Sequence, residues 1–186
     1  MITGARVDLR HVRRDDLETV TRLANDAAVR GEFLPARVMP LRRIEQRFEE
    51  DGLVGGDSEH WLAVDKEDRP VGSIWHNRCS PYDGREIGYI SLRPELRGQG
   101  LITEAVCLLT DYLFRSLQIN RVEICMSVGN IASERVAQKA GYILEGTRRG
   151  ANFVHGRFHD MHLYAMLRSE WEARGRQLAA QRVDKG

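Results

Sequence analysis

A strand, a glycine-bearing loop and a long apolar helix follow one another directly in the middle of this chain. The apolar run Glu86–Leu92 has the length of a strand, and Pro94 ends it. The loop at residues 97–100, Arg-Gly-Gln-Gly, comes next. Residues 101–117 are then apolar on most faces, as in a buried helix. This succession predicts a mixed α/β fold.

The pattern on either side predicts shorter elements. Ahead of the loop stand a first strand, two amphipathic helices and a meander of three strands; after the long helix stand a strand, a helix and a final strand pair. The expected positions are Val7–Arg10, a helix from Leu17, a helix from Pro40 to Gly52, Trp61–Val64, Val71–Trp75, Val122–Met126, Asn130–Ala140, Gly141–Thr147 and Phe158–Leu167, with turns at Asp65–Arg69 and Ser80–Gly84. Gly31–Met39 has no clear period, so a loop over a pocket and an ordinary connector are both open.

The length of 186 residues suits a single domain over residues 1–186, and the expected order of elements is β-α-α-β-β-β-α-β-α-β-β. We expect an α/β fold with a mixed, mostly antiparallel sheet of about seven strands flanked by about four helices. The strand–helix–strand succession in the middle predicts one parallel crossover. Residues 168–186 are expected to form a polar, C-terminal helical tail.

Composition restricts the partners. The chain has 28 basic and 27 acidic residues, a formal net charge of +1, so it lacks the overall basic field that gathers nucleic acid or anionic lipid. Three widely spaced cysteines favour a reducing cytoplasm. The sequence predicts neither a signal peptide nor a membrane span. At strand spacing His159 and His162 point to opposite faces, so no metal is expected.

The loop at residues 97–100 carries the first candidate chemistry. A helix N-terminus exposes unpaired N–H groups, and glycines let a bulky anion approach the backbone closely. Arg97 can bond phosphate oxygens bidentately. The loop is neither a Walker loop nor a dinucleotide fingerprint. On these residues alone, an anion site and a plain tight turn are equally open.

Two stretches of the chain resemble the GNAT acetyltransferase superfamily. Residues 86–100 resemble its fourth strand and coenzyme A loop, which reads Arg/Gln-x-x-Gly-x-Gly/Ala. Arg97 and Gly100 match the first two fixed positions, and Ile102 departs from the third. Residues 128–142 resemble the family's Asn-x-x-Ala/Ser … Lys-x-Gly-Phe/Tyr helix, and the tail is similar to the branch that includes ribosomal-protein-alanine N-acetyltransferases. The likeness covers nearly the whole chain, least in residues 31–60.

The resemblance implies transfer of an acetyl group from acetyl-CoA to a primary amine, by direct attack through a tetrahedral intermediate. Backbone N–H groups of Ile90, Ser91 and Leu92 are expected to hold the oxyanion. The residues expected to hold the pyrophosphate are Arg97, Gly98, Gln99, Gly100, Leu101, Ile102 and Thr103. Ile102 is expected to crowd the pyrophosphate or to shift the helix start.

Three further residues receive roles from the resemblance. Many family members have a tyrosine proton donor where this chain has Ala137, so Ser133, on the same helix face, is expected to act as general acid or to bond the thioester sulfur. Asn130 could bond the pantetheine arm. The alternative for both Ser133 and Asn130 is helix capping. Glu86 is the leading candidate for the base if burial raises its pKa; the alternative is a solvated residue at a strand end.

The acceptor class and the acyl donor stay open. The amine could belong to a protein N-terminus or to a small molecule. Ile102 motivates an alternative donor, an acyl group on the phosphopantetheine of a carrier protein, because such a donor needs no grip on adenosine diphosphate. Ala137 is the one support for a non-catalytic acyl-CoA sensor. The final hairpin offers a surface for a homodimer.

Overall fold

The structure is a computed structural model in which residues 1–34, 38–79 and 83–183 are described, the last six of these by their backbone alone. The predicted connector Gly31–Met39 and the predicted turn Ser80–Gly84 therefore fall partly outside the described residues, as does the end of the predicted tail. No described helix combines the length and the apolar character that crossing a membrane requires.

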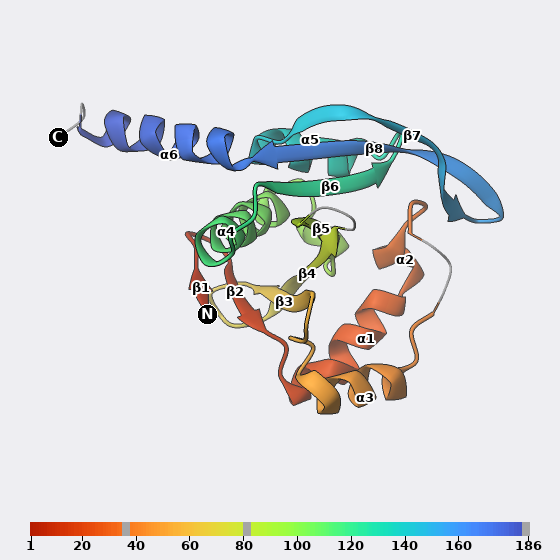
Figure 1. The fold of residues 1–186 in the computed structure, drawn as a ribbon. Helices are drawn as coiled ribbons and strands as arrows, with labels where there is room; N and C mark the ends of the chain where they lie inside the picture. The colour runs from red at the N-terminus through yellow and green to blue at the C-terminus, as the bar shows by residue number, and fades with distance from the viewer. Residues whose placement is uncertain (35–37, 80–82, 184–186) are drawn as a thin grey trace.

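One mixed sheet forms the centre of the molecule (Figure 1). Its strands are β1 (Ile2–Thr3), β2 (Asp8–His11), β3 (Ser58–Val64), β4 (Pro70–Cys79), β5 (Gly84–Ser91), β6 (Arg121–Ser127), β7 (Ile143–Val154) and β8 (Arg157–Leu167). They lie in the order β1-β2-β3-β4-β5-β6-β8-β7. Every neighbouring pair is antiparallel except β5 and β6. The predicted meander and the parallel crossover are both confirmed.

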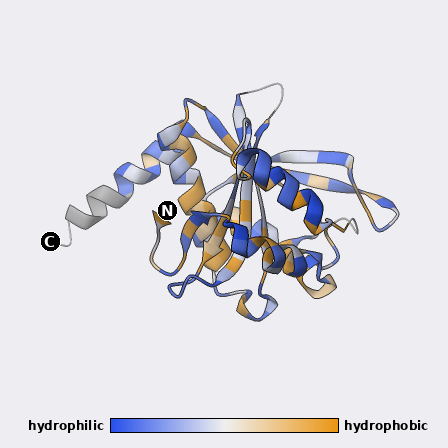
Figure 2. Cartoon of the chain, turned by 90° about the horizontal axis from the view of Figure 1, so that it is seen from below, coloured by the Kyte–Doolittle hydropathy of each residue, from blue (hydrophilic) through white to orange (hydrophobic). Residues whose placement is uncertain are grey.

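Helices cover both faces of this sheet. The helices are α1 (Leu17–Asn25), α2 (Ala27–Arg30), α3 (Leu41–Asp51), α4 (Leu101–Ser116), α5 (Ile131–Ala140) and α6 (Arg168–Val183). Helix α6 projects outward from the end of β8 (Figure 1). Helices α4 and α5 contribute to the larger hydrophobic cluster, with Trp61 and Ala63 of β3. Helices α1 and α3 pack on the other face, against Leu62 and Val64 of the same strand. Because adjacent strand residues point to opposite faces, the continuous apolar run of β3 serves both clusters. Figure 2 shows apolar residues along the central strands and hydrophilic residues along outward helix faces.

Four described elements have no counterpart in the prediction: β1, α2 and the two 3-10 helices Arg14–Asp16 and Pro94–Leu96. Strand β1 has two residues and pairs with β2. Helix α2 has four, and the Asp26 carboxylate caps it by accepting from the Ala28 N–H. Elements this short show no hydrophobic period, which is why the sequence did not reveal them. Strand β7 also runs past its predicted end at Thr147 to Val154, because it pairs with β8 across a register shift between Arg148 and Asn152.

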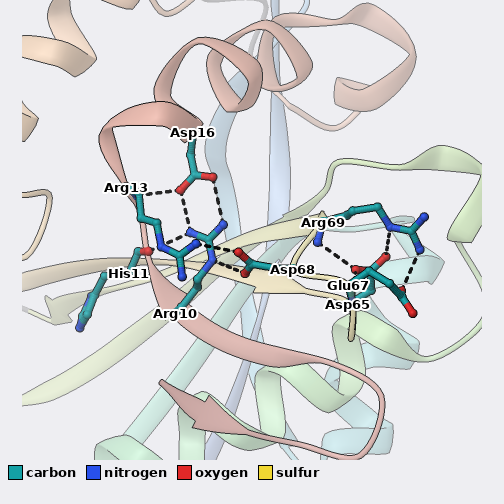
Figure 3. A network of polar contacts seen from close by, with 8 residues as sticks. All are labelled: Arg10, His11, Arg13, Asp16, Asp65, Glu67, Asp68 and Arg69. Carbon is teal, nitrogen blue, oxygen red and sulfur yellow. Dashed lines mark hydrogen bonds and ion pairs between the residues drawn. The ribbon is translucent and has the colours of Figure 1, made fainter.

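A cluster of ion pairs joins β2 to the start of α1 and to the turn between β3 and β4 (Figure 3). The buried Arg10 guanidinium contacts the carboxylates of Asp16, at 2.7 Å, and Asp68, at 2.6 Å. Arg13 contacts the second oxygen of Asp68 at 2.6 Å. The hydrogen bond to Asp16 is the main cause that raises the pKa of Arg10. This cluster anchors the N-terminal helices against the sheet.

Strands β5 and β6 open a gap in the sheet. They pair only where Arg85 lies opposite Val122 and Glu86 lies opposite Glu123. Beyond Glu86 no described strand pairs with β5 on the β6 side. Figure 1 shows β6, β8 and β7 turning away from β4 and β5 as one group. Main-chain groups of β5 that face β6 at the gap are therefore open to a ligand.

Candidate active site

A cavity of about 520 Å³ lies where the loop before α4, the end of β5 and the start of α5 meet. This volume is typical of pockets that hold a small molecule. The cavity is lined by residues 29–34, Val71, residues 89–91, residues 96–103 except Gln99, and Asn130, Ala132, Ser133, Arg135, Val136 and Lys139. It therefore joins the two stretches that the sequence singled out, although residues 100 and 130 are 30 positions apart.

The N-terminus of α4 opens into this cavity. Gly98 and Gly100 have φ angles of +78° and +81°, a conformation that strongly favours glycine. The first helical hydrogen bond is the one that the Glu104 N–H donates to the Gly100 carbonyl. The N–H groups of residues 101–103 are therefore left without helical partners at the positive end of the helix dipole. This arrangement suits a diphosphate and requires no metal.

Two arginines hold the loop before α4 in place. Arg6 donates from NH1 to the Gln99 carbonyl at 2.7 Å and from Nε to the Glu104 carboxylate at 3.2 Å. Gln99 itself does not line the cavity. Arg97 does line it, but its NH2 donates to the carbonyls of Val29, at 2.8 Å, and Ala28, at 3.2 Å. A bidentate contact with phosphate would therefore require NH2 to leave α2.

The side chain of Ile102 is directed at the sheet. A Cβ placed on Gly72 of β4 would lie 2.6 Å from Ile102 Cδ1. The isoleucine thus occupies the space that the missing side chain of Gly72 leaves. Helix α4 begins at Leu101, as expected. The helix start is therefore not shifted. Ile102 also lines the cavity, and its effect on a bound diphosphate stays a prediction.

The end of β5 presents Tyr89, Ile90 and Ser91 to the cavity. Ser91 lies in the part of β5 that has no partner on the β6 side, and its N–H points to that side, as an oxyanion site requires. The Ile90 N–H points to β4, where Ile90 is paired with Ser73. The Leu92 N–H likewise donates to the Val71 carbonyl at 3.0 Å, and the Leu92 side chain is buried. The expectation that Ile90 and Leu92 supply oxyanion donors is wrong, because the N–H groups of both residues face main-chain partners on β4.

The first turn of α5 brings a hydroxyl pair to the cavity wall. Asn130 is the N-cap, and its Oδ1 accepts from the Ser133 N–H at 3.2 Å. Ser133 is therefore not the cap, and its Oγ lies 2.7 Å from the Tyr89 hydroxyl of β5. Burial is the main cause that raises the pKa of Tyr89 to about 12. Ala137, one turn further, is buried in the larger hydrophobic cluster.

From the sequence, packing in the core or on the surface was the expected role of Tyr89, with contact to a substrate as the alternative. Strand alternation places Tyr89 on the same face as the buried Ile87. The distance to Ser133 depends on how α5 packs against β5, and the two residues are 44 positions apart. No pattern in the sequence carries that information.

Glu86 lies on the opposite face of β5 from Tyr89, at the point where the gap begins. It does not line the cavity. Burial is the main cause that raises the pKa of Glu86; Arg148 acts against this shift, and Glu123 adds to it. The side chains of Cys79, Glu86 and Glu123 each offer one atom that could bind a metal ion, and these three atoms lie within 4.8 Å of one another. Arg121 contacts Glu123 at 2.7 Å and neutralises part of this charge.

Comparisons with known proteins agree with this geometry. A family model described as an acetyltransferase (GNAT) domain matches residues 6–143. The protein YdaF of Bacillus subtilis (strain 168) is 42% identical over 97 residues, 52% of each chain. The ribosomal-protein-serine acetyltransferase of Escherichia coli (strain K12) is 37% identical over 103 residues, 55% of this chain and 57% of the relative. The matched segments thus span about half the length of these relatives.

A solved structure of low sequence identity shares the whole fold. It is the spermidine N-acetyltransferase of Vibrio cholerae, in complex with CoA and spermine. The TM-score is 0.77 at 19% identity, and the match covers 90% of this chain and 99% of that one. At this identity the likeness establishes the fold.

Proposed function

Because this chain belongs to the GNAT acetyltransferase family, we propose that it transfers an acetyl group from acetyl-CoA to a primary amine by direct attack on the thioester carbonyl. One observation carries the proposal. The open N-terminus of α4 and the gap between β5 and β6 meet at a single cavity. The helix N-terminus suits a diphosphate. The gap suits an extended thioester arm, because the thioester carbonyl needs hydrogen-bond donors.

The charges of the cavity favour free acyl-CoA over a carrier protein as donor. Arg135 and Lys139, four positions apart on α5, line the cavity together with Arg97. Coenzyme A brings the phosphates of an adenosine diphosphate to such a site, whereas a carrier-bound arm has only one phosphodiester. The original motive for a carrier donor, Ile102, loses its force because Gly72 accommodates that side chain.

The reacting groups have places in this arrangement. In this proposal the Ser91 N–H, which points to the gap beside β5, receives the oxyanion, and Ser133 bonds the leaving sulfur. Glu86 lies at the other face of the sheet, so the amine approaches from that face and loses its proton toward Glu86 or water. A protein α-amine has a pKa near ~8 and is partly neutral at pH 7, whereas a lysine-like amine with a pKa near ~10.4 depends on a base.

Both acceptor classes have a precedent among the relatives. One is named for acetylation of a ribosomal protein serine, and another relative from Escherichia coli, 24% identical, is named as a spermidine N(1)-acetyltransferase. The proposed acceptor is therefore a primary amine of a protein N-terminus or of a small molecule. All three cysteines are free thiols, in keeping with the proposed cytoplasmic location. A homodimer through the β7–β8 hairpin stays a prediction.

A thiol-release screen tests the proposal. Purified protein is given several acyl-CoAs and pools of amines, and free CoA is measured. We expect turnover with acetyl-CoA and a primary amine. Binding of acetyl-CoA without turnover on any amine would favour a sensor, and turnover with a loaded carrier alone would favour the carrier alternative. If no pantetheine thioester interacts with the protein, the proposal fails.

Two glycines provide a matched pair of variants. Gly98, which lines the cavity, and Gly156, in the β7–β8 turn, have φ angles of +78° and +79°, and a Cβ meets no atom within 4 Å at either. Alanine should strain both turns by about 1–2 kcal/mol. We expect Gly98→Ala to weaken CoA binding in calorimetry and Gly156→Ala to leave it unchanged. Equal binding by the two variants would contradict the placement of the diphosphate.

A further inference from the structure

Tyr89 and Ser133 form a hydroxyl pair across the cavity wall. The Tyr89 hydroxyl lies 2.7 Å from Ser133 Oγ and 3.3 Å from the Ser133 carbonyl oxygen. One residue comes from β5 and the other from the first turn of α5, and both line the cavity. Since Asn130 caps α5, the Ser133 hydroxyl is free of any capping role.

Only one direction of this hydrogen bond leaves a proton for the cavity. Each hydroxyl has a single proton to donate and two lone pairs to accept with. If Ser133 donated to Tyr89, its proton would be used within the wall. A phenol is a stronger donor and a weaker acceptor than an aliphatic alcohol. Ser133 Oγ, at 2.7 Å, also lies nearer to the Tyr89 hydroxyl than the competing Ser133 carbonyl oxygen, at 3.3 Å, so Tyr89 donates to Ser133 Oγ. The Ser133 proton then points to the remaining partner, a group in the cavity.

We infer that Tyr89 is a positioning residue, which orients the Ser133 hydroxyl as a hydrogen-bond donor to the thiolate that leaves during acetyl transfer. The inference rests on the proposed function. Two roles were open to Ser133, general acid catalysis and a hydrogen bond to the sulfur. The inference favours the hydrogen bond to the sulfur. A hydrogen bond received by Ser133 also polarises its O–H group and strengthens the bond that it donates.

The proton balance explains this choice. The C–N bond forms and the C–S bond breaks; the amine nitrogen loses one proton to the base or to water, and the thiolate leaves with the bonding electron pair. Burial raises the pKa of Tyr89 to about 12, well above the value of ~8.5 for an alkyl thiol. A thiolate does not take a proton from such a phenol at equilibrium. Tyr89 and Ser133 therefore keep their protons, and the thiolate is protonated by water.

A double-mutant cycle in the full chain tests the pair, with acetyl-CoA and an amine that the wild-type protein acetylates. Tyr89→Phe and Ser133→Ala should each lower kcat about five- to tenfold, the worth of one neutral hydrogen bond. The double variant should lose no more than Ser133→Ala alone, because the two hydroxyls act as one unit. Ser133→Thr, which keeps a hydroxyl, should retain most activity.

A purely structural tie between β5 and α5 would give another result. It would disturb the cavity and raise the Kd of CoA, whereas we expect that Kd, measured by calorimetry, to stay within about twofold of wild type. The pH profile of kcat should keep its shape in Tyr89→Phe. Loss of an alkaline limb would show that Tyr89 gives up its proton and would overturn the inference.

A second pair of hydroxyl groups, from a threonine and a tyrosine, serves as the matched control. Thr110 Oγ1 and the Tyr142 hydroxyl lie 2.6 Å apart, both buried, and neither lines the cavity. Thr110→Val should lower Tm and leave kcat unchanged. Unimpaired kcat in Tyr89→Phe, or additive losses in the cycle, would overturn the inference while the proposed function stands. Absence of turnover by the wild-type protein would overturn both.

Discussion

Ile102 on α4 packs against the bare α-carbon of Gly72 on β4. The contact lies directly beneath the helix N-terminus that opens into the cavity, and Gly72 pairs with Ser91 of β5. A side chain at residue 72 would also approach the Ile90 carbonyl, at 3.2 Å. The size of residue 102 and the absence of a side chain at residue 72 therefore belong together.

The first prediction concerns this contact. Gly72→Ala should push Ile102 and the start of α4 outward, at a cost of about 1–3 kcal/mol for an overpacked site, and should weaken CoA binding. Ile102→Ala in the same chain should remove the clash with Ile102 and restore much of the affinity. Calorimetric titration of CoA into both variants checks this. A double variant that binds no better than Gly72→Ala would show that the contact does not set the helix start.

The second prediction separates two roles of Arg97. Its NH2 holds the Ala28 and Val29 carbonyls, so Arg97→Ala should release the wall of the cavity formed by residues 29–34. Acetyl-pantetheine lacks the diphosphate and provides the comparison. If the wall matters, most of the loss in kcat/KM should remain with acetyl-pantetheine. A loss seen with acetyl-CoA alone would assign Arg97 to phosphate binding.

The third prediction follows from the environment of Glu86. Burial raises the pKa of its carboxyl in the folded state, so the folded protein holds this proton more tightly than the unfolded chain. The stability that results is present in full below the pKa that Glu86 has in the unfolded chain. It is lost as pH rises through the pKa that Glu86 has in the folded protein. Glu86→Gln should therefore raise Tm by a few degrees at neutral pH and have little effect at pH 4. A lower Tm of the variant at pH 7 would contradict the idea that burial of the charged Glu86 carboxylate costs stability.

The same variant tests the proposed base. Glu86→Gln should slow turnover most with lysine-like acceptors, because these need to lose a proton before attack. An α-amine acceptor, which is partly neutral at pH 7, should be less affected. Initial rates over a range of pH with one acceptor of each class provide the measurement. Equal rates for wild type and variant at every pH would remove Glu86 from the mechanism.

The fourth prediction concerns the anchor of α6. Arg168 donates to three carbonyls in the last turn of α4 and the segment that follows it, those of Phe114 at 2.8 Å, Leu117 at 2.7 Å and Ile119 at 2.8 Å. Arg168→Ala should lower the free energy of unfolding by about 2–3 kcal/mol, because charge-assisted bonds are lost. Urea unfolding measures this. Arg176→Ala is the control, since the exposed Arg176 reaches Glu172 only at 4.0 Å, and should change stability by less than ~0.5 kcal/mol.

The order of the elements could be predicted because its signals are local. Alternating and helical hydrophobic periods, turn residues and the break at Pro94 each act over a few neighbours in the chain. The glycine loop before α4 was visible for the same reason, since a positive φ at Gly98 and Gly100 is a property of single residues. Elements of two or four residues, such as β1 and α2, stayed hidden because they are too short for a hydrophobic period to repeat.

The amino-acid sequence by itself therefore determined the α/β fold, the parallel crossover and the helix N-terminus at the centre of the site. The tertiary structure alone decided which groups contact one another. Tyr89 is hydrogen-bonded to Ser133, Arg97 to carbonyls of α2 and the Leu92 N–H to Val71, while Ile102 packs against Gly72. The physical reason is that a side chain's direction and contacts depend on how distant elements pack. No local pattern in the chain records that packing.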